Sequence, residues 1–211
     1  MKNVLAFFGA FNPPTSAHLE LADFARQAAG REGVLFDPSR MDYIRNEQGK
    51  DFAFSNEERL EMLRRLAESR PWMQVSGWEL QQEKQPRSYL TLCHLREEGY
   101  TPSLLLGSDK LRELSSGWKY VPEIAREFGI VCLVRENDPC ESIIQSDPLL
   151  RSLSDCIELL ETPACWRNVS SSAVRKLLRE NRADDTEWAP MVPEEIRDLV
   201  RKGEDHGRNM L

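Results

Sequence analysis

The sequence predicts an α/β fold, a doubly wound parallel sheet with helices on both faces. Two observations support this prediction. Short apolar runs alternate along the whole chain with segments of helical periodicity. The chain shows no internal repeat and no linker-like stretch, so these elements belong to one domain. Ligands of such sheets bind at the carboxyl ends of the strands, where we therefore look for functional residues.

The predicted strands are short runs rich in Val, Ile, Leu and Phe. The runs "SLLLG" and "IVCLVR" are the most apolar of them. A further segment with alternating apolar residues is expected to be extended. The strands are predicted over residues 3–8, 33–37, 103–107, 130–135 and 157–160, and the extended segment over residues 73–80.

The predicted helices begin or end at recognisable signals. Ser55 and Glu58 form a capping box, and Leu60, Leu63 and Leu66 with Ala67 make an apolar stripe. Residues 38–54 show no periodicity, which is typical of a long functional or mobile loop. Helices are predicted over residues 16–29, 55–70, 88–98 and 121–128, within 136–155, from the serine cluster at 170–172 onward, and from Val192 onward.

Length and composition favour one globular domain. The chain has 211 residues, of which 40% are hydrophobic. We predict one domain over residues 1–203 with a small C-terminal helical portion, and a disordered tail over residues 204–211. No apolar run approaches the roughly 20 residues that span a bilayer, and the beginning of the chain does not resemble a signal peptide. A cytoplasmic protein is expected.

Charge and cysteine content exclude several classes of protein. The net charge of −7 argues against a dedicated nucleic-acid binder, although a few local cations and helix N-termini can still hold an anionic small substrate. The five cysteines include no C-x-x-C pair. Their number is odd, which argues against a disulfide framework or a zinc site. No residue is therefore predicted to bind a metal.

The stretch "FGAFNPPTSAH", residues 8–18, connects the first strand to the first helix. A small Gly9–Ala10 pair allows close approach to the backbone, and two prolines stiffen the turn. Thr15 and His18 can face one phosphate at the positive end of the helix dipole, which also disfavours protonation of the empty histidine. The alternative is a tight turn with a histidine that only caps or packs. Neither a P-loop nor a G-x-G-x-x-G fingerprint is present.

Two separated motifs resemble those of one enzyme superfamily. "GAFNPPTSAH" resembles the G-G-x-F-[DN]-P-x-[HT]-x-x-H signature of the nucleotidyltransferases, and "VSSSAVR" at residues 169–175 resembles their I-S-S-T-x-I-R motif. "SLLLGSDKL" with "SGWKYVPEI" resembles the L-x-G-x-D…W segment of the nicotinate and nicotinamide mononucleotide adenylyltransferases, as do "ERLEMLRRL" and "SYLTL". The resemblance extends over roughly residues 4–178 and implies a Rossmann-like fold.

The resemblance implies a specific reaction. Such enzymes transfer AMP from ATP to nicotinate or nicotinamide mononucleotide, release pyrophosphate, and form deamido-NAD or NAD in NAD biosynthesis. Mg²⁺ is expected together with ATP. The implied partners are ATP and a pyridine mononucleotide, with no nucleic acid and no membrane, and a homo-oligomer is compatible with the sequence.

The resemblance also implies roles for individual residues. Those matching ATP-binding positions are Gly9, Ala10, Phe11, Thr15, His18, Gly107, Asp109, Ser171, Ser172 and Arg175. His18, Thr15 and Arg175 match positions that contact the phosphates during transfer and are the predicted catalytic residues. Gly107 and Asp109 match residues that hold the adenosine ribose. The predicted acceptor-binding residues are Lys50, Ser88, Tyr89 and Trp118, of which Trp118 matches a tryptophan that stacks on the pyridine ring.

Some positions depart from the family pattern and leave alternatives open. Ala10 and Ala17 replace glycines, and the usual Pro-His-Lys element is missing, so Lys50 is the candidate for its lysine. The acceptor could be another phosphorylated molecule such as phosphopantetheine, or the chain could be a non-catalytic nucleotide-binding homologue. Asp109 could instead cap a helix, Trp118 could belong to the core, and the serines at 170–172 could form only an N-cap.

Overall fold

The computed structural model describes residues 2–46, 49, 54–135, 138–166, 169–179 and 187–208, except the side chains of residue 164 and residues 203–208. Six strands form one sheet in the order β3-β2-β1-β4-β5-β6. They are β1 (Lys2–Gly9), β2 (Gly33–Pro38), β3 (Met73–Val75), β4 (Tyr100–Gly107), β5 (Ile130–Val134) and β6 (Ile157–Glu161). The predicted α/β fold is confirmed.

The strands pair in parallel, as the alternation of strands and helices predicts. Leu5 of β1 lies opposite Ser103 of β4, and Cys132 of β5 lies opposite Leu159 of β6. All five residues of β5 are buried, as are all six of β2. Such continuous burial explains why β5 appears in the sequence as an unbroken apolar run rather than as an alternating one. The strand β2 is apolar only as far as Phe36, because its next residue is Asp37.

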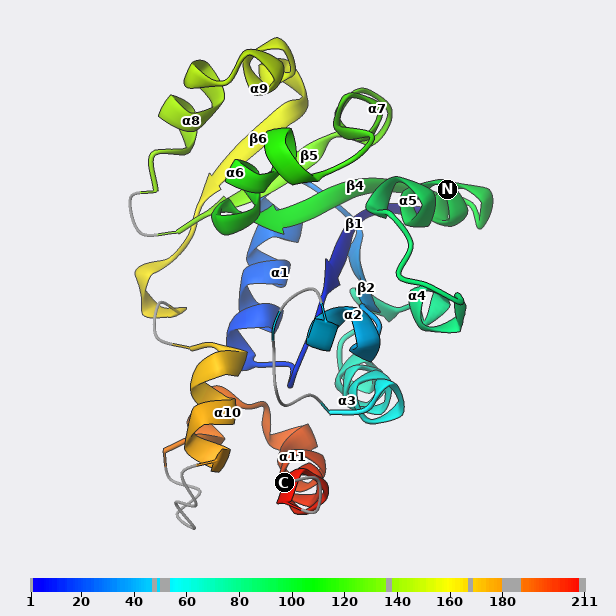
Figure 1. The fold of residues 1–211 in the computed structure, drawn as a ribbon, viewed down its shortest axis with the longest axis vertical. Coiled ribbons are helices and arrows are strands. Elements are labelled where there is room, and N and C mark those ends of the chain that lie inside the picture. Colours follow the sequence, from blue (N-terminus) through cyan, green and yellow to red (C-terminus); the bar gives the residue numbers. More distant parts are fainter. Residues whose placement is uncertain are drawn as a thin grey trace. The chain divides into compact units, whose positions relative to one another are not determined.

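Eleven α-helices are assigned within the described residues (Figure 1). They are α1 (Ser16–Ala28), α2 (Met41–Asn46), α3 (Asn56–Glu68), α4 (Trp78–Gln81), α5 (Ser88–Glu97), α6 (Ser108–Gly117), α7 (Val121–Phe128), α8 (Cys140–Ser146), α9 (Pro148–Ser152), α10 (Ser171–Arg179) and α11 (Arg197–Arg208). Short 3₁₀ turns lie at Ser154–Cys156, Ala164–Trp166, Ala189–Met191 and Glu194–Ile196.

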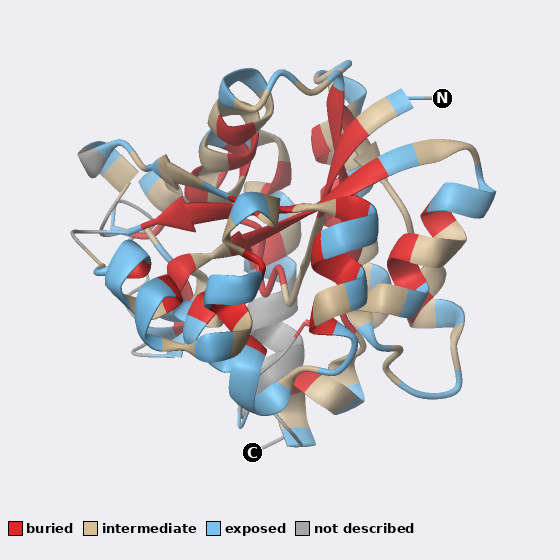
Figure 2. Cartoon of the chain, turned by 90° about the horizontal axis from the view of Figure 1, so that it is seen from above, coloured by how far each residue is buried: buried red, intermediate tan, exposed pale blue. Residues whose placement is uncertain are grey.

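The chain forms two compact units. The first comprises Met1–Phe8, Leu21–Leu35 and Pro86–Arg167. Within it, α5 and α7 pack against β4, and α6 packs against β4 and β5. Its core is a single apolar cluster, which lies mainly on the strands and on the inward faces of the helices (Figure 2). The segments that follow β4 and β5 also belong to this unit.

The second unit comprises Gly9–Glu20, Phe36–Gln85 and Asn168–Leu211. Within it, α3 packs against β3 and against α11. Its buried side chains include Phe36, Phe54, Leu63 and Trp188. This unit contains the turn after β1 and the helix α10, so both predicted phosphate-binding motifs lie in it.

Several elements differ from their predictions. The segment predicted as a loop over residues 38–54 contains the helix α2, and the segment predicted as extended over residues 73–80 turns into α4 after β3. The helix α11 is assigned as far as Arg208, and the disordered tail over residues 204–211 stays a prediction. Residues 209–211 lie outside the described residues. The domain boundary at residue 203 stays a prediction. Among the described residues, no helix combines the length and apolarity that a membrane crossing requires.

Candidate functional site

Thr15 and His18 lie where the turn after β1 leads into α1. The backbone N–H of Thr15 donates to Nδ1 of His18 at 3.1 Å, and Thr15 Oγ1 lies 2.7 Å from the same nitrogen. Because a backbone N–H only donates, Nδ1 accepts this bond and holds no proton. The neutral imidazole therefore has its proton on Nε2, which is the nitrogen suited to donate to a phosphate oxygen.

Phe11 shapes the middle of this turn. Its backbone is left-handed, with φ at 43°, and its ring packs against His18 and Phe36 with centroid distances of 5.3 and 5.4 Å. A Cβ atom at Gly9 would lie 3.3 Å from Cζ of Phe11. The glycine therefore makes room for the ring of Phe11 next to the end of β1, a role in packing that the sequence did not predict.

The second motif lies at the start of α10, in contact with the same turn. Ser170 Oγ accepts a hydrogen bond from the backbone N–H of Ala173 at 3.1 Å, as an N-cap does. Ser171 Oγ donates to the carbonyl of Pro13 at 2.7 Å. Residues 158 positions apart are thus brought into direct contact, and the serine cluster does more than cap its helix.

Arg175 makes a second contact between α10 and the turn, from a buried side chain. Its Nη1 donates to the carbonyl of Asn12 at 2.7 Å and its Nη2 to Ser172 Oγ at 3.1 Å. The side chain is buried, and within the described part of the chain its Nε has no hydrogen-bond partner. Burial lowers the pKa of this guanidinium, and the nearby positive charge of Arg179 adds to the effect. In this conformation Arg175 fixes the turn.

Arg59 of α3 is a residue that sequence reasoning missed. Its side chain is fully buried, and Nη1 donates to the carbonyl of Ala10 at 2.7 Å. Nε donates to the carbonyl of Phe54 and Nη2 to Oδ1 of Asn56. Burial lowers its pKa to about 10. A signal was present in the sequence, because Arg59 lies three and seven positions before the buried Met62 and Leu66.

Comparison with known proteins identifies the family. The model of the cytidylyltransferase-like family matches residues 6–177, which include both motifs and most of the chain. The chain belongs to the cytidylyltransferase-like family. The predicted resemblance to nucleotidyltransferases is confirmed.

Individual relatives narrow the family further. A nicotinamide/nicotinic acid mononucleotide adenylyltransferase of Arabidopsis thaliana is 29% identical over 189 residues, which are 83% of this chain and 79% of that protein. A probable nicotinate-nucleotide adenylyltransferase of Caldicellulosiruptor saccharolyticus is 29% identical over 200 residues, 95% of this chain and 97% of that protein. The chain is also similar to the solved structure of the Plasmodium falciparum nicotinic acid mononucleotide adenylyltransferase complexed with NaAD. The alignment covers 100% of each chain, with a TM-score of 0.75 and 20% identity, and supports the fold.

In this member of the cytidylyltransferase-like family, the predicted ribose-binding residues lie in the first unit, at the end of β4. Gly107 is the last residue of the strand, and Asp109 lies in the first turn of α6. A Cβ atom at Gly107 would lie 2.6 Å from Oδ1 of Asp109, which is too close for two non-bonded atoms. Only a glycine at this position allows the observed conformation of the Asp109 carboxylate. Ser108, between them, donates to Oδ2 of Asp138 at 2.5 Å.

The predicted acceptor-binding residues of the same unit have varied surroundings. Ser88 begins α5, and Trp118 follows α6 and is partly buried against the apolar cluster. Tyr89 stacks on Tyr120 with ring centroids 5.2 Å apart and donates to Oε1 of Glu127 at 3.0 Å. The hydrogen bond to Glu127 is the main cause that raises the pKa of Tyr89 to about 12. Lys50, the remaining acceptor candidate, lies outside the described residues.

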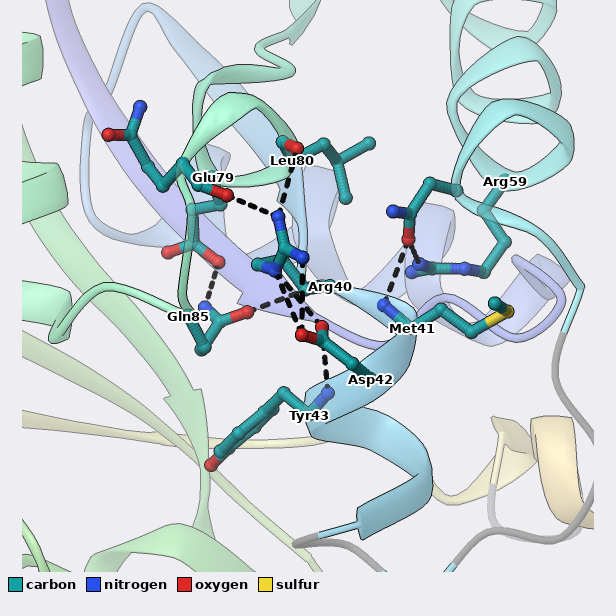
Figure 3. A network of polar contacts seen from close by, with 10 residues as sticks. Arg40, Met41, Asp42, Tyr43, Arg59, Glu79, Leu80 and Gln85 are labelled. Carbon is teal, nitrogen blue, oxygen red and sulfur yellow. Dashed lines mark hydrogen bonds and ion pairs between the residues drawn. The ribbon is translucent and has the colours of Figure 1, made fainter.

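A polar network follows β2, where the Pro-His-Lys element of related enzymes is missing (Figure 3). Arg40, which sequence reasoning also missed, lies at its centre. Its guanidinium pairs with Asp42 at 3.0 Å and donates to the carbonyls of Leu80 and Gln82, while its backbone N–H donates to Oε1 of Gln85 at 2.8 Å. These bonds hold the segment after β2 to the end of α4.

A buried carboxylate lies beside this network. Asp37, in β2, is fully buried, and the backbone N–H of Glu79 approaches its Oδ1 at 3.4 Å. Its Oδ2 is buried and has no partner within the described residues. Burial raises the pKa of Asp37 to about 7, against the opposing effect of hydrogen bonds from the Ser76 side chain and the Glu79 backbone. Asp37 therefore takes up a proton near neutral pH.

Proposed function

We propose that this protein transfers AMP from ATP to a pyridine mononucleotide, nicotinate or nicotinamide mononucleotide, and releases pyrophosphate. The observation that carries the proposal is the junction of two distant motifs at one turn. Thr15 orients His18, while Ser171 and Arg175 bond to the carbonyls of Pro13 and Asn12. Two of the named relatives are adenylyltransferases for nicotinate or nicotinamide nucleotides. The products are deamido-NAD or NAD.

The chemistry requires positioning and charge stabilisation. A phosphate oxygen of the acceptor forms a bond to the α-phosphorus of ATP, and the bond from this phosphorus to the bridging oxygen of the β-phosphate breaks. The electron pair leaves with pyrophosphate, which takes up the negative charge. The acceptor phosphate is already ionised, so no general base is needed. Donors directed at the phosphates then supply most of the catalysis.

The second unit supplies the proposed phosphate contacts. His18 donates from Nε2 to the phosphates, and Thr15 fixes the orientation of its ring. Ser171 and Ser172 lie in the first turn of α10, whose positive end favours an anion. Arg175 holds the turn in place from a buried position. The backbone of Gly9, Ala10 and Phe11 lines the nucleotide in this proposal.

The first unit supplies the proposed contacts to the sugar and the acceptor. Asp109 accepts hydrogen bonds from the ribose hydroxyls, next to Gly107. Trp118 and Tyr89 offer aromatic faces for the pyridine ring, and Ser88 offers a hydroxyl. A role for Lys50 at the acceptor stays a prediction from the sequence.

Magnesium enters this proposal as part of the substrate, bound to the triphosphate of ATP, where it neutralises charge. Within the described residues, no group of three or more His, Cys, Asp or Glu side chains is arranged to hold a metal ion. We further propose that the protein works in the cytoplasm on small molecules, alone or as a homo-oligomer, and that residues 1–203 form its nucleotidyltransferase domain.

The decisive experiment measures pyrophosphate release from ATP and Mg²⁺ with three acceptors: nicotinate mononucleotide, nicotinamide mononucleotide and phosphopantetheine. Release with a pyridine mononucleotide is expected. His18→Ala should lower kcat by roughly 30- to 1,000-fold, which corresponds to about 2–4 kcal/mol of lost transition-state stabilisation. Arg175→Ala should lower activity as well, because the turn loses one of its supports.

The matched control is His94→Ala, on α5, whose side chain lies 3.7 Å from a carboxylate of Glu98. This variant should retain wild-type turnover. Release only with phosphopantetheine would favour the alternative acceptor, and ATP binding without any release would favour a non-catalytic homologue. Unchanged turnover in His18→Ala would refute the role assigned to this residue.

A further inference from the structure

Arg59 presents an unusual problem in electrostatics. Its guanidinium is fully buried and makes three hydrogen bonds, to the carbonyls of Ala10 and Phe54 and to the side-chain oxygen of Asn56. All three acceptors are uncharged. Where the chain is described, Arg59 forms no ion pair with a carboxylate. Glu57, on the same helix, attracts the guanidinium, but this effect on the pKa of Arg59 is smaller than that of burial. A buried cation whose hydrogen-bond partners are all neutral is costly to desolvate.

Arg175 repeats the same arrangement at the same turn. It is 5% exposed and donates to the carbonyl of Asn12 and to a serine hydroxyl, again both uncharged. The two guanidinium groups therefore hold the carbonyls of Ala10 and Asn12, on either side of Phe11. Both positive charges belong to one compact unit, in a chain whose net charge is −7.

The bond from Arg59 also orients a donor. In a trans peptide, the C=O of one residue and the N–H of the next point in opposite directions. Because Nη1 of Arg59 holds the Ala10 carbonyl at 2.7 Å, the N–H of Phe11 is directed away from Arg59. A charged donor on the carbonyl also polarises the peptide group and strengthens its N–H as a donor.

We propose that Arg59 is a positioning residue for a polyphosphate, whose negative charge balances the buried charges of Arg59 and Arg175, and that the bond from Arg59 to the Ala10 carbonyl directs the Phe11 N–H toward that anion. The ligand class is a di- or triphosphate chain. This inference rests on the proposed function, since it assigns the phosphates of the nucleotide to this turn. It adds a residue outside both motifs to the phosphate site.

The test compares variants that separate charge from geometry. Arg59→Met removes the charge and keeps an apolar chain of similar reach. Arg59→Lys keeps the charge but replaces the planar fork with a single ammonium group. The matched control is Arg65→Met on the same helix, where Arg65 is half-buried and, unlike Arg59, pairs with a carboxylate, that of Asp198. The probes are inorganic tripolyphosphate and adenosine, with binding measured by calorimetry.

Arg59→Met should bind tripolyphosphate at least tenfold more weakly than the wild type and the Arg65→Met control, with unchanged affinity for adenosine. Arg59→Lys should retain tripolyphosphate affinity within about threefold, yet lower kcat for pyrophosphate release at least tenfold, because the Phe11 N–H is no longer held in place. This division between binding and kcat is not expected of a residue that only stabilises the fold. If the methionine variant does not fold, the lysine variant decides.

A folded Arg59→Met variant with wild-type affinity for tripolyphosphate, or an Arg59→Lys variant with wild-type kcat and KM, would overturn the inference. These outcomes are separate from the fate of the proposed function. Tripolyphosphate binding that depends on Arg59, without pyrophosphate release from any acceptor, would refute the proposed function and leave the inference standing. Normal pyrophosphate release in the wild type and in both Arg59 variants would support the proposed function and refute the inference about Arg59.

Discussion

The backbone N–H of Thr15 donates to Nδ1 of His18 over a distance of 3.1 Å. This bond determines which ring nitrogen holds the proton, and therefore which one faces a ligand as a donor. At neutral pH we expect His18 to be in the Nε2–H form. Nitrogen NMR of the imidazole side chains measures the tautomer directly, and the His18 signals are assigned by their absence in His18→Ala.

Thr15→Ala is the informative variant for this prediction. It removes the hydroxyl that lies 2.7 Å from Nδ1 but keeps the backbone donor. The Nε2–H form should therefore persist in the variant. A proton found on Nδ1 of the wild-type histidine would show that the Thr15 backbone does not control the ring.

Asp37 predicts an unusual dependence of stability on pH. Its pKa in the folded protein is raised to about 7, from an ordinary value of 3.8, because the carboxyl group is buried. Between these two values the folded state binds more protons than the unfolded state, so the free energy of unfolding falls as pH rises. Asp37→Asn should remove this loss, which amounts to about 3 kcal/mol between pH 5 and pH 8.

Urea unfolding at several pH values between 5 and 8 measures the effect. Asp42→Asn is the control, because Arg40 lowers the pKa of this exposed carboxylate and it stays ionised throughout the range. In the Asp42→Asn variant, the free energy of unfolding should change with pH in the same way as in the wild type. If the Asp37→Asn profile were parallel too, the carboxyl group would not be the source of the pH dependence.

The strands β4 and β5 could be predicted from the sequence because consecutive residues in them are buried and they appear as apolar runs. The helices α2 and α4 could not. Each has only four to six residues, too few for a periodic pattern or for stability of its own. Their positions depend on bonds such as those from Arg40 to the carbonyls of Leu80 and Gln82, which join segments 40 or more residues apart.

The site shows the same division between local and distant signals. Thr15 and His18 are three residues apart, so their proximity could be predicted at a helix start. The bonds from Ser171 and Arg175 to the turn span more than 150 residues, and only the resemblance to a family pointed to them. Arg59 was missed because the predicted stripe centred on Leu60, whereas the buried face of α3 is rotated toward Arg59 and Met62.

The capping box of α3 gives a prediction about stability. Ser55 Oγ accepts from the backbone N–H of Glu58 at 3.1 Å, and the Glu58 carboxylate accepts from the backbone N–H of Ser55 at 2.7 Å. Ser55→Ala should lower the free energy of unfolding by about 1 kcal/mol. Urea denaturation provides the measurement. Ser116→Ala, at an exposed site in α6, should change it by less than about 0.5 kcal/mol. Equal effects of both substitutions would contradict the assigned cap.

The last prediction concerns Gly107 and the ribose. The backbone at Gly107 is extended, with φ at −89°, so alanine fits the conformation. Its Cβ, however, would lie 2.6 Å from Oδ1 of Asp109. The carboxylate is the end of a short side chain and can rotate away, so Gly107→Ala should change the free energy of unfolding by less than about 1 kcal/mol.

Function should respond more strongly than stability. If Asp109 accepts hydrogen bonds from the ribose hydroxyls, its displacement in Gly107→Ala should weaken ATP binding by about tenfold. Binding of 2′,3′-dideoxy-ATP, which lacks both hydroxyls, should change little. Gly117→Ala, at the end of the helix α6 that follows Gly107, is the matched control, since a Cβ atom there has no neighbour within 4 Å. The ratio of the two affinities separates contact with the ribose from a general disturbance of the site, because a disturbance would weaken both nucleotides equally. If the Gly107→Ala variant prefers ATP to 2′,3′-dideoxy-ATP as strongly as the wild type does, Asp109 does not bind the ribose. That result would favour the alternative role of Asp109 as a helix cap.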